Sequence, residues 1–197
     1  MTPLPRTYFE NPDVVTLARD LLGKTVFTNF DGQLTGGIIT ETEAYRAPED
    51  KASHAYNGRR TPRTEVMYGS GGHAYVYLCY GIHHLFNIVT NVAGVPHAVL
   101  IRAIQPTDGL DFIHRRRAGK LTTNGPGTVS EALGITTALS GAPLDVDPIW
   151  IADLGHRPQN VIASPRVGID YAAEWAAMPW RFSCSEIPQP GILQPNA

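Results

Sequence analysis

A strand-like run of residues 34–45, "LTGGIITETEAY", most constrains how this chain can fold. A shorter run, "KTVFTNF", precedes it, and the turn "DGQ" between them predicts an antiparallel pair of strands. Because successive side chains of a strand point to opposite faces, Glu41, Glu43 and Tyr45 should share one face. Carboxylates placed together can carry out acid–base chemistry when burial or neighbouring groups tune them. For Glu41 we expect a solvated strand edge or a purely structural role, whereas Glu43 has aromatic and small neighbours.

The remaining pattern predicts a single α+β domain over residues 1–197, with more strands than helices. Short connections between the strands favour antiparallel pairing. Further strands are predicted at 73–91 (a hairpin that turns near Gly81), 97–106, 144–153 and 180–184. Helices are predicted at 10–24, 47–58, 107–119 and 125–135, and a loose tail at 186–197. In the first helix we expect Asn11 to be the N-cap and Pro12 to lie in the first turn.

Composition indicates a turn-rich globular protein, with 19 glycines and 16 prolines beside 43% hydrophobic residues. The two cysteines, Cys79 and Cys184, suggest no disulfide framework, so we expect an intracellular protein with free, buried thiols. We predict a cytoplasmic protein without a membrane partner, because no apolar run could span a bilayer and the N-terminus lacks a signal peptide's apolar core. The formal net charge of −2 means that a nucleic-acid partner would need a local basic patch.

The predicted hairpin is unusually rich in aromatic residues. In "YVYLCYGIHH", Tyr75 and Tyr77 should share one face of a strand and Tyr80 should lie at the turn. Strand tyrosines usually belong to the core or to cross-strand pairs. An aromatic residue at an exposed tip can instead wedge between bases, and a strand tyrosine can stack on one.

Basic residues form two clusters. Arg59, Arg60 and Arg63 follow the acidic segment directly, so they either contact phosphate or form a solvated face. The second cluster, 115–120, is more simply a solvated face. The "GPG" before the helix at 125–135 could bind an anion, but it lacks the Lys-Ser/Thr of a P-loop.

The histidines do not predict a metal site. His83 and His84 are adjacent on a strand and should point to opposite faces, so they should not share one ion. No H-x-E with a later C-x-x-C occurs, which argues against a zinc deaminase site. We therefore expect a protein without a metal or another cofactor.

Five segments occur in one order between about residues 7 and 184: "IITETEAYRAPEDKASHAYNGRRTPR", "YVYLCYGIHHLFNIV", "VLIRAIQP", "LTTNGPG" and "SPRVGI" with the later "AAEW" and "RF". In this order they resemble the alkyladenine (3-methyladenine) DNA glycosylase family of the mammalian type, in a compact bacterial version. The resemblance implies a monofunctional base-excision repair enzyme that flips a damaged purine out of double-stranded DNA. A water then hydrolyses the N-glycosidic bond. It further implies no lyase activity, a monomer, and a nucleoid-associated place in the cytoplasm.

Carried over by motif position, the resemblance also implies residue roles. Glu43 resembles the general base, Arg102 the arginine that helps to hold the water, and the backbone carbonyl of Val167 the water's third partner. The expected substrates are alkylated or deaminated purines: 3-methyladenine, 7-methylguanine, hypoxanthine and ethenoadenine. The proton for a neutral leaving base has no evident donor in the sequence.

The other implied roles concern DNA. Base-pocket walls would be Tyr45, His54 and Tyr77, and Asn87 would obstruct the exocyclic amino group of guanine. Tyr80 and Ile82 would intercalate into the DNA, and Arg59, Arg60 and Arg63 would contact its phosphates.

The sequence departs from the family's pattern in two places. Thr128 stands where the family usually has Lys, and Ile82-His83 stands where it has Met-Tyr. Two other functions stay open: a non-catalytic nucleic-acid-binding protein, and a small-molecule nucleoside hydrolase. Glu43 with Arg102 argues against the first, and a protruding Tyr80 against the second, since a free nucleoside needs no wedge.

Overall fold

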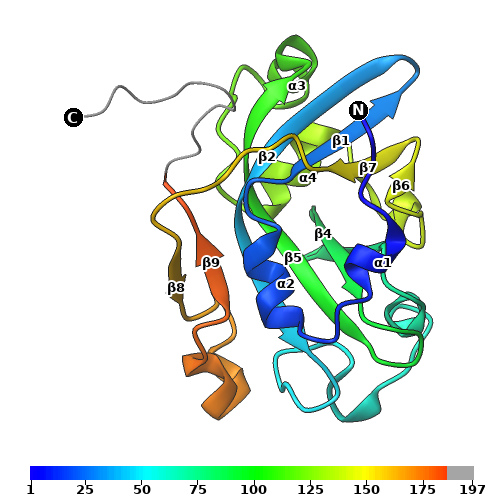
Figure 1. The fold of residues 1–197 in the computed structure, drawn as a ribbon, viewed down its shortest axis with the longest axis vertical. Coiled ribbons are helices and arrows are strands. Elements are labelled where there is room, and N and C mark those ends of the chain that lie inside the picture. The colour runs from blue at the N-terminus through cyan, green and yellow to red at the C-terminus, as the bar shows by residue number, and fades with distance from the viewer. Residues whose placement is uncertain (186–197) are drawn as a thin grey trace.

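The computed structural model describes residues 1–185, which form a curled antiparallel sheet packed with short helices (Figure 1). The strands are β1 Thr25–Phe30, β2 Gln33–Arg46, β3 His73–Cys79, β4 His83–Thr90, β5 His97–Asp108, β6 Asp145–Val146, β7 Ile149–Ala152, β8 Ile162–Ser164 and β9 Arg181–Ser183. The α-helices are α1 Arg6–Phe9, α2 Val14–Asp20, α3 Leu110–Arg116 and α4 Pro126–Leu133. The 3-10 helices are η1 Tyr56–Gly58, η2 Glu65–Tyr68, η3 Thr137–Leu139 and η4 Asp170–Ala177. The fold is therefore α+β, as predicted.

The sheet runs in the order β3-β4-β5-β2-β1-β7-β6, and every pair in it is antiparallel. Both predicted hairpins are confirmed. β1 and β2 pair from Thr25–Ile38 to Phe30–Gln33, and β3 and β4 pair from His73–Val89 to Cys79–His83. The long β2 is central, with β1 beside its first half and β5 along most of its length.

An irregularity in β2 gives its second half a different neighbour. The pairing with β5 shifts register on both sides of Glu41, as at a β-bulge. From Glu41 to Glu43 the free edge of β2 then pairs with β9, which carries β8 on its other side. The stretch that carries the acids is therefore enclosed by β5 and β9.

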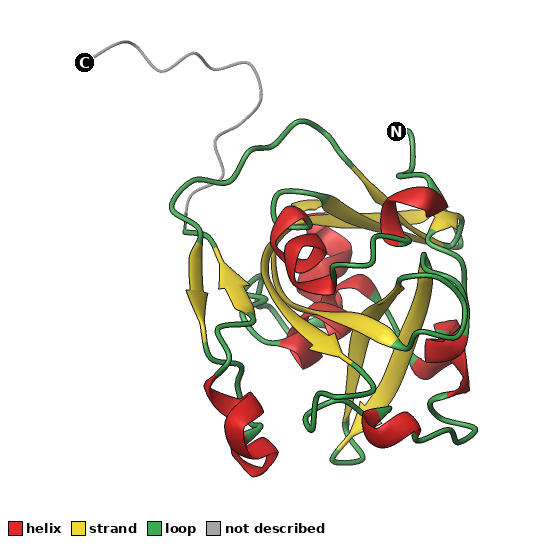
Figure 2. Ribbon diagram, turned by 60° about the horizontal axis from the view of Figure 1, so that its bottom comes forward, coloured by secondary structure: helices red, strands yellow, loops and turns green. Residues whose placement is uncertain are grey.

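The core lies between the sheet and helices α2 and α4, around which the strands curve (Figure 2). Its apolar side chains alternate along the strands, as in Ile39 of β2 and Val99 and Ile101 of β5, and they meet Leu17 of α2 and Val129 of α4. Thr42 is also buried, and its hydroxyl donates to the carbonyl of Ala18 at 2.7 Å. The opposite faces of β2 and β5 are thus left for polar groups.

Two of the helix predictions are corrected. The helix predicted at 10–24 is α2, and it begins later than expected. Asp13 is its N-cap and accepts hydrogen bonds from the N–H groups of Val15 and Thr16. Asn11 and Pro12 lie before the cap.

The helix predicted at 47–58 is wrong, since its residues form turns and only the short η1. The carboxylate of Asp50 accepts from the N–H of Arg46 and of Ala52, so this segment folds around a side chain. Such local side-chain bonds compete with a helical backbone.

Other expectations stand as follows. Cys79 and Cys184 are free, but each is partly exposed and not buried. The helices at 107–119 and 125–135 are confirmed as the shorter α3 and α4. Within residues 1–185, none of the helices combines the length and apolarity that crossing a membrane requires. The predicted tail at 186–197 lies outside the described residues.

Candidate active site

The side chain of Glu43 is completely buried and accepts hydrogen bonds at both carboxylate oxygens. Oε2 accepts from the hydroxyl of Tyr45 at 2.8 Å, and Oε1 accepts from the backbone N–H of Val167 at 2.8 Å. Nη1 of Arg102 lies 3.4 Å from Oε1. A buried charge is tolerated only with such partners. Burial, together with Glu43, raises the pKa of Tyr45 well above its usual value, so its phenol stays protonated and donates.

Glu41 lies beside this group and completes a balanced cluster of charges. Its Oε1 accepts from Nε of Arg102 at 3.0 Å and from Nη1 of Arg181 at 3.0 Å. Two carboxylates, Glu41 and Glu43, therefore face two guanidinium groups. These contacts favour a structural role for Glu41 over a solvated strand edge, because its carboxylate holds Arg102 in place.

A cavity of about 630 Å³ opens in front of Glu43. Tyr45, His54, Tyr77 and Asn87 all line it, together with Arg102 and Val167. The structure thus brings together the side chains expected at the catalytic centre and at the base pocket. The volume of this cavity is within the range of small-molecule binding sites.

His54 and the hairpin tyrosines form one aromatic wall of this cavity. Nδ1 of His54 lies 2.7 Å from the hydroxyl of Tyr75, and its ring meets the ring of Tyr77 edge-on with centroids 4.6 Å apart. Burial, with smaller contributions from Arg63 and Arg59, lowers the pKa of His54 to about 4. Because Nη2 of Arg63 can only donate to Nε2, at 3.2 Å, the neutral ring carries its proton on Nδ1 and donates it to Tyr75.

Asn87 lies on β4, opposite Tyr75 of β3. It is buried, and its side-chain amide donates to the carbonyls of Tyr75 at 3.1 Å and Leu85 at 3.3 Å. Both bonds use the nitrogen, which fixes the orientation of the amide at the cavity wall.

The tip of the β3–β4 hairpin projects into solvent. Tyr80 is 92% exposed and Ile82 is 71% exposed. The N–H of Ile82 donates to the carbonyl of Cys79, and Tyr80 and Gly81 between them have φ angles of 52° and 75°. Gly adopts such left-handed φ angles easily, whereas a bulky residue rarely does. A strained, exposed aromatic at this place is not explained by packing.

The three arginines of the predicted basic patch differ from one another. Arg60 forms a two-pronged ion pair with Glu65 at 2.8 and 2.6 Å. Arg63 lies over the ring of Tyr77 at 4.7 Å and lines the cavity. Arg59 is exposed, and its side chain forms no ion pair within residues 1–185. The hydroxyl of Thr128 bonds to Gly125 at the start of α4, so it caps the helix instead of extending outward.

Sequence reasoning missed two parts of the site. Arg166 and Asp50 form a completely buried ion pair directly behind Tyr45. Tyr171, which is 70% exposed, lines the same cavity as Tyr80. Only the position of Arg166 next to Val167 could have signalled its importance. Among the described residues, 1–185, no group of three or more His, Cys, Asp or Glu side chains is placed to hold a metal ion.

Comparison with known proteins gives a consistent family. A family model described as "Methylpurine-DNA glycosylase (MPG)" matches residues 8–188. A protein of Chlamydia abortus named "Putative 3-methyladenine DNA glycosylase" is 50% identical over 184 residues, which cover 91% of this chain and 96% of the relative. A protein of Bacillus mycoides with the same name is 44% identical over 192 residues, covering 90% of this chain and 94% of the relative.

Proposed function

We propose a mechanism from one premise: the chain belongs to the methylpurine-DNA glycosylase family. It is therefore a DNA glycosylase, a hydrolase of base-excision repair whose substrate is DNA. The further steps, from lesion choice to the role of each residue, are our proposal. The observation that carries it is a buried carboxylate, Glu43, at the end of a cavity with aromatic walls.

Glu43 acts as the general base. Its two fixed donors, the Tyr45 hydroxyl and the Val167 N–H, hold the carboxylate in one orientation. The carboxylate takes a proton from a water, which attacks the anomeric carbon as the base leaves. Arg102, 3.4 Å from the same carboxylate, helps to hold that water, and the carbonyl of Val167 is its third partner in this proposal.

The flipped purine lies between Tyr45 on one side and His54 with Tyr77 on the other. Alkylated purines such as 3-methyladenine and 7-methylguanine are cationic, and aromatic faces attract cations. Their glycosidic bonds are already weak, so they need less catalysis than neutral hypoxanthine or ethenoadenine. Asn87, held rigidly by two carbonyls, occupies the space that the amino group of guanine would need.

The hairpin tip opens the duplex. Tyr80, supported by Ile82, enters the minor groove and fills the space that the flipped nucleotide leaves. Arg59 is the best placed of the three arginines for phosphate contact, because Arg60 is held by Glu65 and Arg63 by the cavity wall.

We propose a monofunctional monomer that needs no cofactor. A lyase step requires an amine nucleophile. The chain has three lysines: Lys24 pairs with Asp153, Lys51 pairs with Glu174, and the third is Lys120. None of the three lines the cavity. Trapping of a covalent protein–DNA adduct with borohydride would contradict this assignment.

One experiment separates this function from its alternatives. The protein is incubated with duplex DNA that carries a single hypoxanthine and, in parallel, with free inosine. We expect release of hypoxanthine from the duplex only. Release from inosine at a comparable rate would indicate a nucleoside hydrolase, and binding of the duplex without release would indicate a non-catalytic binder.

A further inference from the structure

We propose that Arg166 is the positioning residue of this active site, because it holds both hydrogen-bond donors of Glu43 in place. This inference rests on the proposed role of Glu43. Arg166 itself does not line the cavity, so it would act on the reaction only through its neighbours.

Arg166 ties three segments together from a completely buried position. Its guanidinium forms a two-pronged ion pair with Asp50, with Nη1–Oδ2 at 2.5 Å and Nη2–Oδ1 at 2.9 Å. Nη1 also donates to the carbonyl of Ala44 on β2 at 2.8 Å, and Nη2 to the carbonyl of Trp175 on η4 at 3.2 Å. A planar guanidinium can make these contacts at once, whereas a lysine ammonium is a single point charge.

The first route to Glu43 runs through the backbone. Arg166 directly precedes Val167, whose N–H donates to Oε1 of Glu43. The side chain of Val167 is half exposed, and Gly168 follows with a φ of 73°. Packing of Val167 itself therefore does little to fix this N–H, and the anchor is the buried arginine before it.

The second route runs through an aromatic ring. The guanidinium of Arg166 lies over the ring of Tyr45, 4.7 Å from its centroid, and the hydroxyl of that ring donates to Oε2 of Glu43. Arg166 also holds the carbonyl of Ala44, the residue between Glu43 and Tyr45. One side chain thus fixes the partner of each carboxylate oxygen.

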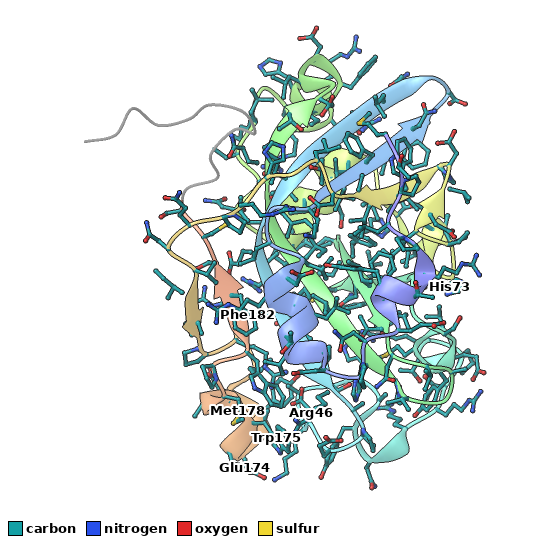
Figure 3. All side chains as sticks on the ribbon, in the orientation of Figure 1. Arg46, His73, Glu174, Trp175, Met178 and Phe182 are labelled. Carbon is teal, nitrogen blue, oxygen red and sulfur yellow. The ribbon has the colours of Figure 1, made fainter. Side chains whose placement is uncertain are left out.

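The surrounding segment supports this arrangement. Arg46 at the end of β2 lies over the rings of Trp175 and Trp180, and Figure 3 shows Arg46 beside Trp175 and Met178. The guanidinium of Arg166 also lies 5.2 Å from the ring centroid of Trp180. The η4 segment is thereby held against the end of β2, with Arg166 behind the catalytic carboxylate.

The test is Arg166→Lys, which keeps a charge opposite Asp50 but loses the planar fork. Single-turnover excision of hypoxanthine from duplex DNA and the Kd for the same duplex are measured together. We expect excision to fall about 10- to 100-fold, as for a small displacement of a catalytic group, with Kd changed less than about threefold. If Arg166→Lys does not fold, Asp50→Asn takes its place, with the same expected split between rate and binding.

A double-mutant cycle with Tyr45→Phe gives a readout that a structural role would not move. That variant keeps the ring and removes only the hydroxyl. If Arg166 acts through Tyr45, Arg166→Lys should cost a smaller factor in the Tyr45→Phe background than in the wild type. Lys24→Met is the matched control, because it breaks the largely buried Lys24–Asp153 pair away from the cavity and should leave excision by the folded protein unchanged.

The outcomes separate this inference from the proposed function. If the wild-type protein excised no base, the proposed function itself would be wrong. Wild-type excision with an unchanged rate in Arg166→Lys would overturn only the inference. Rate and binding that fall in parallel would show that Arg166 is merely structural. Factors that multiply fully in the cycle would remove the route through Tyr45 and so overturn the claim that Arg166 holds both donors.

Discussion

Replacing Glu43 by Gln separates the chemistry of the carboxylate from its shape. Of the two oxygens that accept hydrogen bonds in the wild type, the amide keeps one. That oxygen should face the Val167 N–H, which can only donate, and leave the NH₂ group to the Tyr45 hydroxyl, which can rotate and accept. Arg102 still has Glu41 as a partner, so no charge is left buried alone. We therefore expect the variant to fold.

The expected loss of excision is ~10²–10⁴-fold, the usual contribution of a general base, which corresponds to about 3–5 kcal/mol in the barrier. Single-turnover excision is measured on duplexes with hypoxanthine and with 7-methylguanine, whose cationic base leaves more easily and should be affected less. Binding is measured in parallel and should stay near the wild-type value, since flipping and stacking do not need the carboxylate.

Glu174→Gln is the matched control for Glu43→Gln, because it makes the same substitution at an exposed carboxylate that pairs with Lys51 and does not line the cavity. It should retain most of the excision activity. Wild-type excision of hypoxanthine by Glu43→Gln would refute the assignment of the base. Loss of folding together with binding would instead make Glu43 structural.

Four other predictions address DNA recognition and pH. Tyr80→Ser should slow excision from paired duplex by the loss of a stacking contact, about 1–3 kcal/mol, and should matter less where the lesion is already unpaired; equal losses on both substrates would count against a wedge. Asn87→Ser should admit guanine, and unchanged discrimination between hypoxanthine and guanine in excision assays would remove Asn87 from the selectivity argument. Arg59→Gln should reduce the slope of log binding constant against log salt concentration by about 0.9. Arg60→Gln should reduce it by less, because Glu65 already pairs with Arg60, and equal reductions in the two variants would contradict this difference. The pKa of His54 is about 4 in the folded protein and near 6.5 in the unfolded chain, so the unfolded chain binds more protons between these values and stability should fall as the pH drops from about 6.5 towards 4. In His54→Asn the denaturation midpoint should depend less on pH across this range. A pH dependence equal to that of the wild type would argue against the burial of a neutral ring.

Local pattern was enough to predict the parts of the site that lie close together in sequence. Alternation along β2 placed Glu43 and Tyr45 on one face, and the structure joins them by a hydrogen bond. The same logic placed Tyr75 and Tyr77 together, with ring centroids 5.5 Å apart. The hairpin predicted to turn near Gly81 placed Tyr80 at its tip, and Tyr80 is 92% exposed there. Each of these predictions needed only the period of a strand or the geometry of a turn.

Contacts between distant segments could not be predicted in this way. Asp50 and Arg166 are 116 positions apart, and no periodicity links them. Because this contact could not be predicted, a helix was wrongly expected at 47–58. Pro48 and two acids suit a helix start, but the carboxylate of Asp50 is committed to Arg166 and to nearby N–H groups. Local propensity gives way where a buried charge needs every partner it can reach.

Two costly features of the molecule mark the two halves of the proposed function. Burying the carboxylate of Glu43 is unfavourable unless donors from separate segments meet it, and the chain supplies them from β2, β5 and the loop of Val167. Exposing Tyr80 in a left-handed conformation is unfavourable too, since its side chain is 92% exposed. A fold selected for stability alone would place an apolar side chain at 43 and a glycine at 80. In the proposed mechanism both costs become useful only when DNA is bound, since the base and its water would meet Glu43 at the moment when Tyr80 fills the space that the base has left.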